Sequence, residues 1–203
     1  MIKNRKNKKG FTLIELLVVI AIIAILAVVV VLTLNPAELL RQARDSNRIS
    51  DFATLKSAIG LYSEDVATSS PLAPAGTIYI STLPTATTPT TTILESSTMT
   101  AWWGFAGGES TTTGSSSRAI NGNGWIPINF TLISSGAPIG SLPVDPVNSA
   151  LNVYTFTASS TVYKLATKME SVKYSTGGSG DVESNDGGNS TTTYEQGTAL
   201  TSL

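Results

Sequence analysis

A single charged residue interrupts a long apolar stretch near the start of the sequence. Between Phe11 and Leu34 every residue is uncharged except Glu15. A charged side chain costs about 2.5–3.5 kcal/mol at the centre of a membrane and less near its edge, so such a group usually has a partner. No basic residue lies within the stretch to supply one. Glu15 is therefore expected to pair with a cation from outside this segment.

A cut between Gly10 and Phe11 would create that cation. The new α-amino group of Phe11 would lie four residues from Glu15 at the membrane edge. A neighbouring copy, shifted along its axis, could present its amine to this carboxylate and neutralise both charges in an apolar setting. Gly10 suits the cut, because a residue without a side chain can enter a narrow protease site in an extended conformation.

A second group of residues with possible chemistry lies in a glycine-rich segment near the end of the sequence. Asp181, Glu183 and Asp186, beside Asn185, offer the hard oxygen ligands that calcium prefers. The spacing does not match an EF-hand, because the twelfth position is Thr192 and not Glu. Two interpretations follow, a calcium site and a solvated acidic turn.

Two residue types that often carry chemistry are absent, since the sequence has no cysteine and no histidine. Disulfide bonds, Cys/His zinc sites and catalysis by Cys or His are therefore excluded. Outside the acidic segment the carboxylates of the body are scattered. We expect no enzymatic activity, and no cofactor other than calcium at that segment.

The basic residues are unevenly distributed along the chain. Five of the 13 lysines and arginines lie within the first nine residues, and the remainder carries 8 basic against 14 acidic residues. This mildly acidic remainder has no basic stripe, so we expect no direct nucleic-acid binding. The basic start of the chain is expected to stay in the cytoplasm, with the body on the outer side of the membrane.

The stretch from Phe11 to Leu34 predicts a membrane-spanning helix. Its 24 residues would extend about 36 Å, which is enough for a hydrocarbon core of about 30 Å. A cleaved secretory signal is one alternative, because AIIAILA (21–27) has small residues at a suitable spacing, but the run is too long for a usual signal. A plain membrane anchor is the other, and it leaves Glu15 unexplained.

A second helix is predicted from 37 to 65. It follows Asn35 and Pro36, where the missing backbone donor and the ring of proline predict a kink or a helix boundary. Apolar residues then recur every three or four positions, which is typical of an amphipathic helix packed on a sheet. The stripe consists of Ile49, Phe52, Leu55, Ile59 and Tyr62, and the charged residues placed elsewhere on the helix are Arg44, Arg48, Asp51 and Lys56.

The rest of the chain predicts a small sheet with long loops. Residues 66–100 form a Ser/Thr/Pro-rich connection in which only 77–82 resembles a strand. Trp102, Trp103 and Phe105 are expected in the core or in a subunit contact, with an adhesive patch as the alternative. Three strands are predicted at 124–133, 151–157 and 161–169, the last two as an antiparallel hairpin.

The residues Lys9-Gly10-Phe11-Thr12-Leu13-Ile14-Glu15, between a basic leader and an apolar run, resemble the prepilin signature of type IV pilins and type II secretion pseudopilins. The resemblance is close over residues 1–65 and looser beyond. It implies that a membrane aspartyl peptidase cuts between Gly10 and Phe11 and methylates the new amino terminus of Phe11. It also implies that Glu15 is needed for assembly.

A second resemblance lies in Leu142-Pro-x-Asp145-Pro146, which is followed by a Tyr-containing strand. It is similar to the turn before the sheet in secretion-type major pseudopilins, although the usual Trp or Phe plus Gly after Asp-Pro is missing. Those pseudopilins bind calcium in a loop near this part of the chain. The resemblance thus implies calcium at Asp181, Glu183 and Asp186.

The expected fold is a pilin-like α+β fold, in which one long N-terminal helix packs on a small antiparallel sheet. Its divisions are a cleaved leader (1–10), a transmembrane or filament-core helix (11–34), an amphipathic continuation (35–65) and an extracellular globular region (66–203). The chain is expected as a single-pass protein of the cytoplasmic membrane that later enters an extracellular filament or pseudopilus.

The resemblance implies a structural subunit of a type IV pilus-like filament. The alternative within the family is a pseudopilin of a type II secretion or DNA-uptake machine. An alternative from another functional class is a single-pass, membrane-anchored binding domain that keeps residues 1–10. The implied partners are membrane lipid, copies of the chain and related pilins, the prepilin peptidase, and an assembly platform with a cytoplasmic ATPase.

Overall fold

The computed structural model describes residues 10–66, 71–81, 111–149, 152–201 and 203. The chain divides into two compact units, Met1–Leu40 and Arg41–Leu203, which are described separately. The Ser/Thr-rich connection falls largely outside the described residues, and so do Trp102, Trp103 and Phe105.

The first unit contains the apolar helix α1, Leu13–Leu34. Thr12 is its N-cap, and every side chain of the helix that the structure describes is exposed. The segment Leu13–Val31 is long and apolar enough to cross a membrane, with a mean hydropathy of 3.4. Such a surface requires a covering of lipid or of other helices, because isolated apolar patches of this size are rare in soluble proteins.

The helix is interrupted where proline predicts it. Asn35 adopts a left-handed conformation, with φ 39° and ψ 73°, and α2 (Pro36–Asp65) starts at the next residue. Pro36 disfavours helical geometry at the preceding residue but suits the first position of a helix. The sequence Asn35-Pro36 therefore ends α1 and starts α2.

The second unit is built on a five-stranded sheet with the order β2-β1-β3-β4-β5. Its strands are β1 Thr77–Ser81, β2 Thr111–Ser115, β3 Thr155–Ser159, β4 Val162–Thr167 and β5 Tyr194–Gly197. The pairs β1–β3, β3–β4 and β4–β5 are antiparallel, whereas β1 and β2 run parallel. The sheet is thus mostly antiparallel, as expected, with one parallel pair at its β2 edge.

The predicted hairpin is confirmed as β3 and β4, in a register that pairs Thr155 with Ala166. The strand predicted at 77–82 is β1. The strand predicted at 124–133 is wrong, because this segment runs as turns that lead into a short 3-10 helix, η1, Phe130–Leu132. Most of its apolar side chains are buried all the same, with Leu132 exposed, so the apolar composition of the segment indicated burial and not strand geometry.

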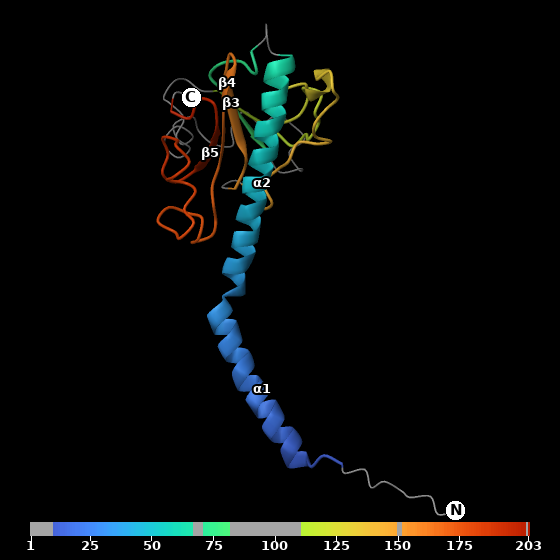
Figure 1. Ribbon diagram of the computed structural model, residues 1–203, viewed down its shortest axis with the longest axis vertical. Helices are drawn as coiled ribbons and strands as arrows, with labels where there is room; N and C mark the ends of the chain where they lie inside the picture. Colours follow the sequence, from blue (N-terminus) through green and yellow to red (C-terminus); the bar gives the residue numbers. More distant parts are fainter. Residues whose placement is uncertain (1–9, 67–70, 82–110, 150–151, 202) are drawn as a thin grey trace, which may run out of the picture. The chain divides into compact units, whose positions relative to one another are not determined.

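The core lies between α2 and the sheet, which Figure 1 shows side by side. The predicted apolar stripe of α2 faces it: Phe52, Leu55 and Ile59 are fully buried and Tyr62 packs against them. Phe52 contacts the rings of Tyr154 and Tyr194, with centroid distances of 5.1 and 5.7 Å. The other large members of this core are Trp125, Ile126, Ile128, Phe130, Phe156, Tyr163 and Leu165.

Candidate processing and assembly site

Glu15 closes the first turn of α1 through a capping box with Thr12. The Thr12 backbone N–H and hydroxyl each donate to Glu15 Oε2 at 2.8 Å, and the Glu15 N–H donates to Thr12 Oγ1 at 3.3 Å. The spacing Thr-x-x-Glu is the sequence signature of this arrangement. A carboxylate at this position also interacts favourably with the positive end of the helix dipole.

The capping box adds a partner for Glu15 that the sequence prediction overlooked, whereas the pairing of Glu15 with a cation from outside its segment stays a prediction. In the single chain Thr12 supplies two donors, and the Thr-x-x-Glu spacing could have revealed them. Among the described residues, the hydrogen bonds to this carboxylate both end on Oε2. The second oxygen can therefore accept from a further group while the capping box stays intact.

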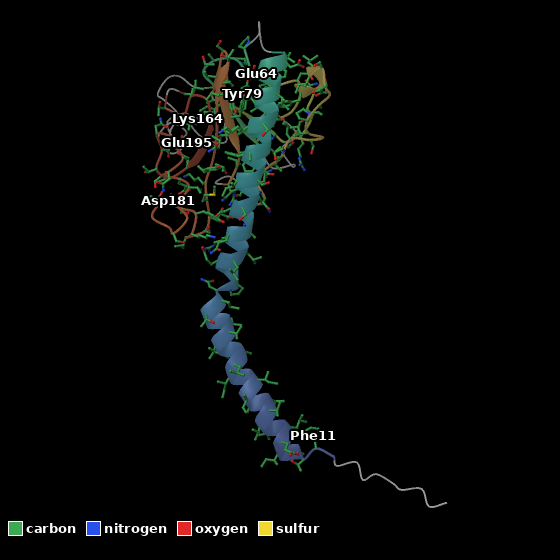
Figure 2. All side chains as sticks on the ribbon, viewed as in Figure 1. Phe11, Glu64, Tyr79, Lys164, Asp181 and Glu195 are labelled. Atoms are coloured by element: carbon green, nitrogen blue, oxygen red, sulfur yellow. The ribbon has the colours of Figure 1, made fainter. Side chains whose placement is uncertain are left out.

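Gly10 and Phe11 lie next to this capping box in open surroundings. A Cβ added to Gly10 would meet nothing within 4 Å, and Phe11 is 92% exposed. Figure 2 labels Phe11 at the start of the helix. Phe11, Ile14, Glu15, Val18 and Val19 line an apolar hollow of about 380 Å³. The peptide bond between Gly10 and Phe11 is thus accessible, and the carboxylate lies at the edge of an apolar surface.

A buried ion-pair cluster joins α2 to the loops of the second unit. Arg48 Nε and Nη2 donate to the two oxygens of Asp145 at 2.6 and 2.9 Å. Arg48 Nη1 donates to Asp45 at 2.6 Å and to Glu170 at 3.0 Å, and Arg44 Nε donates to Glu170 at 2.6 Å. Asp45 also accepts from the backbone N–H groups of Glu170 and Ser171. A bidentate arginine–carboxylate pair fixes both distance and orientation.

Arg48 lies four residues before Phe52 and therefore on the buried face of α2, although its charge led to the prediction that it lies elsewhere on the helix. Its side chain is 0% exposed, as is that of Asp145. Burial disfavours the charged form of Arg48, but the hydrogen bonds and charges of Asp145, with those of Asp45 and Glu170, raise its pKa. Burial likewise opposes ionisation of Glu170, yet the hydrogen bonds from Arg44 and Arg48 hold its pKa below the usual range.

The Leu142–Pro146 motif forms the turn that holds Arg48. Asp145 Oδ1 also accepts from the backbone N–H groups of Val147 and Asn148, at 2.8 and 3.1 Å. Pro143 accepts a hydrogen bond of 2.9 Å from the indole of Trp125. The motif therefore ties the helix, the 124–133 segment and the approach to β3 together, which is a structural role and not a ligand site.

The three candidate calcium ligands lie in one loop but have separate hydrogen-bond partners. Asp181 accepts from Ser184 and from the Gly177 N–H, and the Ser184 hydroxyl leads the contacts that lower the pKa of Asp181 to about 2. Glu183 is buried and accepts from the N–H groups of Met169 and Thr176.

Asp186 accepts from the N–H groups of Gly188 and Glu195, at 2.8 and 2.5 Å. Burial is the main cause that raises the pKa of both Glu183 and Asp186. Within the part of the chain that the structure describes, no group of three or more carboxylates is placed to hold a metal ion. Calcium binding stays a sequence prediction, and the geometry favours a turn whose carboxylates bind their own loop.

A scan against protein families matches residues 5–31 to the prokaryotic N-terminal methylation motif. Neither the curated proteins nor the solved structures give a significant match. The matched residues contain Gly10, Phe11 and Glu15, together with most of α1. The chain therefore carries the N-terminal signature of type IV pilins and pseudopilins, on an α+β fold in which α2 packs against a mostly antiparallel sheet.

Proposed function

We propose that this chain is a structural subunit of a type IV pilus-like filament, cut after Gly10 and polymerised through α1. The observation that carries the proposal is the accessible Gly10–Phe11 bond beside Glu15, at the start of an apolar helix whose described side chains are all exposed. The methylation motif supports processing by a prepilin peptidase, with methylation of Phe11. A cytoplasmic ATPase and its membrane platform would then drive assembly.

The chemistry of α1 explains why Glu15 matters in such a polymer. Lipid tails are as apolar as leucine, so the transfer of α1 from lipid into a helix bundle gains little from the hydrophobic effect. Contacts between valine, isoleucine and leucine side chains also do little to fix the axial position of one helix relative to its neighbours. A charge pair between Glu15 and the new amine of a neighbouring subunit is strong in this apolar setting and is satisfied at one register only.

A pseudopilin of a type II secretion or DNA-uptake machine is the second candidate. The Leu142–Pro146 turn supports it, because its sequence resembles the turn before the sheet in secretion-type major pseudopilins. The acidic loop adds no support among the described residues, since its carboxylates do not converge on one point. The two candidates share processing and anchoring, and they differ in the length of the filament.

Mass spectrometry of the N-terminal peptide tests the proposal, on protein sheared from the cell surface and on protein kept in the membrane. We expect a peptide that starts at Phe11, carries one added methyl group and is abundant in the sheared fraction. Processed protein confined to membranes would favour the short pseudopilus. An intact leader in both fractions would refute the assembly role and leave an anchored binding domain.

A matched pair of glycine variants controls for non-specific effects. Gly10→Leu places a large side chain at the cleavage position, and we expect it to keep residues 1–10 and to stay in the membrane. Gly60→Ala changes a glycine of α2 where an added Cβ meets nothing within 4 Å. It should be processed and sheared as the parent protein is.

A further inference from the structure

A lysine of β4 is buried in the interior of the second unit. The Lys164 side chain is 0% exposed, and so is that of Glu195 on β5. Lysine is almost never fully buried without a partner. Lys164 Nζ lies 2.6 Å from Glu195 Oε1 and 2.8 Å from Asn189 Oδ1, and it also contacts the backbone oxygens of Leu200 and Leu203 at 3.0 and 3.3 Å. Figure 2 labels Lys164 and Glu195 next to each other.

The ammonium group faces more acceptors than it has hydrogens. It carries three N–H donors, whereas four oxygens lie within 3.3 Å of Nζ. Glu195 Oε1 is the nearest of the four, yet within the described residues it is a buried atom without a hydrogen bond of acceptable geometry. Movement of one proton from Nζ to Oε1 would remove two buried charges and give Oε1 a proton to donate.

We propose that Lys164 and Asn189 form an intramolecular isopeptide bond, with Glu195 as the catalytic acid–base that touches the reacting amine. The proposal rests on the contacts of Lys164 and is independent of the proposed filament role.

The reaction needs no external reagent. The Lys164 ammonium gives a proton to Glu195, and the neutral amine attacks Cγ of Asn189, whose Oδ1 already lies at hydrogen-bond distance. The amine loses its second proton as the Cγ–Nδ2 bond breaks, and Nδ2 leaves as ammonia. Ammonia then takes the proton held by Glu195. One Nζ–Cγ amide bond is formed and one ammonium ion is released, with Glu195 returned to its initial state.

The surroundings of Glu195 hold the reacting groups in place. Its Oε2 accepts from the Ser190 N–H at 3.2 Å, next to Asn189, and its own N–H donates to Asp186. A Cβ at position 188 would clash with this carboxylate, so any other residue there would displace the Glu195 side chain from its present position. Burial is the largest influence on the carboxyl group and raises the pKa of Glu195, as an acid–base role requires. Asn189 is exposed on its other side, which gives ammonia a route to solvent.

The bond would fasten the loop before β5 to β4, the neighbouring strand of the sheet. Among the described residues, β5 lies at the edge of the sheet and pairs with β4. The sequence has no cysteine, so a disulfide bond cannot serve this purpose. A covalent link between β4 and residue 189 would restrict the unfolded chain as a disulfide bond does.

Tryptic digestion of the purified full chain tests this proposal. In a linear chain trypsin cuts after Lys164, Lys168 and Lys173. With the bond, we expect no cut after Lys164 and a branched peptide in which 119–168 is joined to 174–203. Its mass should be the sum of the two peptides less one ammonia. Linear peptides from the folded parent protein would overturn the proposal.

Variants assign the roles of the three residues. Lys164→Arg and Asn189→Ala should give linear peptides only, whereas the matched controls Lys168→Arg and Asn185→Ala should keep the branch. Glu195→Gln should lose the branch while its near-ultraviolet circular dichroism stays native. Full branching in Glu195→Gln would overturn the role of Glu195 as acid–base. Branching at another lysine would overturn the assignment of Lys164.

Discussion

At the scale of single residues, Arg48 joins α2 to the loops of the second unit through three carboxylates. Replacement by methionine fills a similar space but leaves Asp45 and Asp145 buried without their counter-ion. Removal of one partner from a buried ion pair costs about 3–5 kcal/mol. We expect Arg48→Met to lower the free energy of unfolding by about that amount, measured by denaturant titration with near-ultraviolet circular dichroism.

Arg44→Met is the matched control, because Arg44 contacts the same Glu170 but its side chain is 32% exposed. Exposed ion pairs contribute about 0–1 kcal/mol. Equal losses in the two variants would contradict the view that the buried bidentate pair with Asp145 supports the fold.

The ionisation of Glu170 should make the free energy of unfolding depend on pH. Burial favours its neutral form, but the hydrogen bonds from Arg44 and Arg48 outweigh burial and lower its pKa. Its ionised form therefore stabilises the native state above the unfolded pKa of about 4.3, and this contribution is lost as the pH falls through the lower folded pKa. We expect the difference in unfolding free energy between the parent and Glu170→Gln to be largest at neutral pH and to shrink below about pH 4.3. A difference that grows on acidification would refute this.

At the scale of elements, the break between α1 and α2 is set by the pair Asn35-Pro36. Pro36 disfavours helical geometry at Asn35, which adopts φ 39° instead. We expect Pro36→Ala to let Asn35 become helical and the helix to run on without interruption. The Cα chemical shift of residue 35 in detergent micelles measures this.

Asn35→Gly is the control for the break, since glycine adopts the left-handed conformation at no steric cost. It should keep the interruption. A left-handed residue 35 in Pro36→Ala would mean that contacts other than the proline hold the break.

The elements that sequence could predict are those with a clear period. Spacings of three and four residues predicted α2 and its buried face, and alternation predicted β3 and β4. The strand prediction for 124–133 failed because Trp125, Ile126 and Phe130 are buried although the segment is irregular. The parallel pairing of β1 with β2 joins segments far apart in the chain, and no local pattern carries that information.

The sites divide in the same way. Glu15 and Gly10 could be proposed as site residues because the methylation motif lies in one short contiguous segment. The partner of Arg48 could not be identified, because Asp145 lies 97 residues away. The surroundings of Lys164 could not be predicted from the sequence either, since they are formed by two strands and the loop before β5.

At the scale of the whole molecule, the function of Glu15 divides into a hydrogen-bonding part and an ionic part. Glu15→Gln keeps the capping box, because glutamine also serves at this position, but it removes the charge. Glu15→Leu removes both. If the charge sets the register between subunits, both variants should be cut after Gly10 and both should stay in the membrane fraction. The Phe11 peptide, quantified by mass spectrometry in the sheared and membrane fractions, measures this.

The comparison of the two variants is decisive because Thr12 already satisfies Oε2 in the single chain. We expect Glu15→Gln to fail as completely as Glu15→Leu, since an amide cannot neutralise the amine of a neighbouring subunit in an apolar setting. Glu38→Gln, which alters a carboxylate in the first turn of α2, should assemble normally. If Glu15→Gln reached the sheared fraction as the parent does, the carboxylate would be a helix cap, and the register of the filament would have to come from the packing of α1.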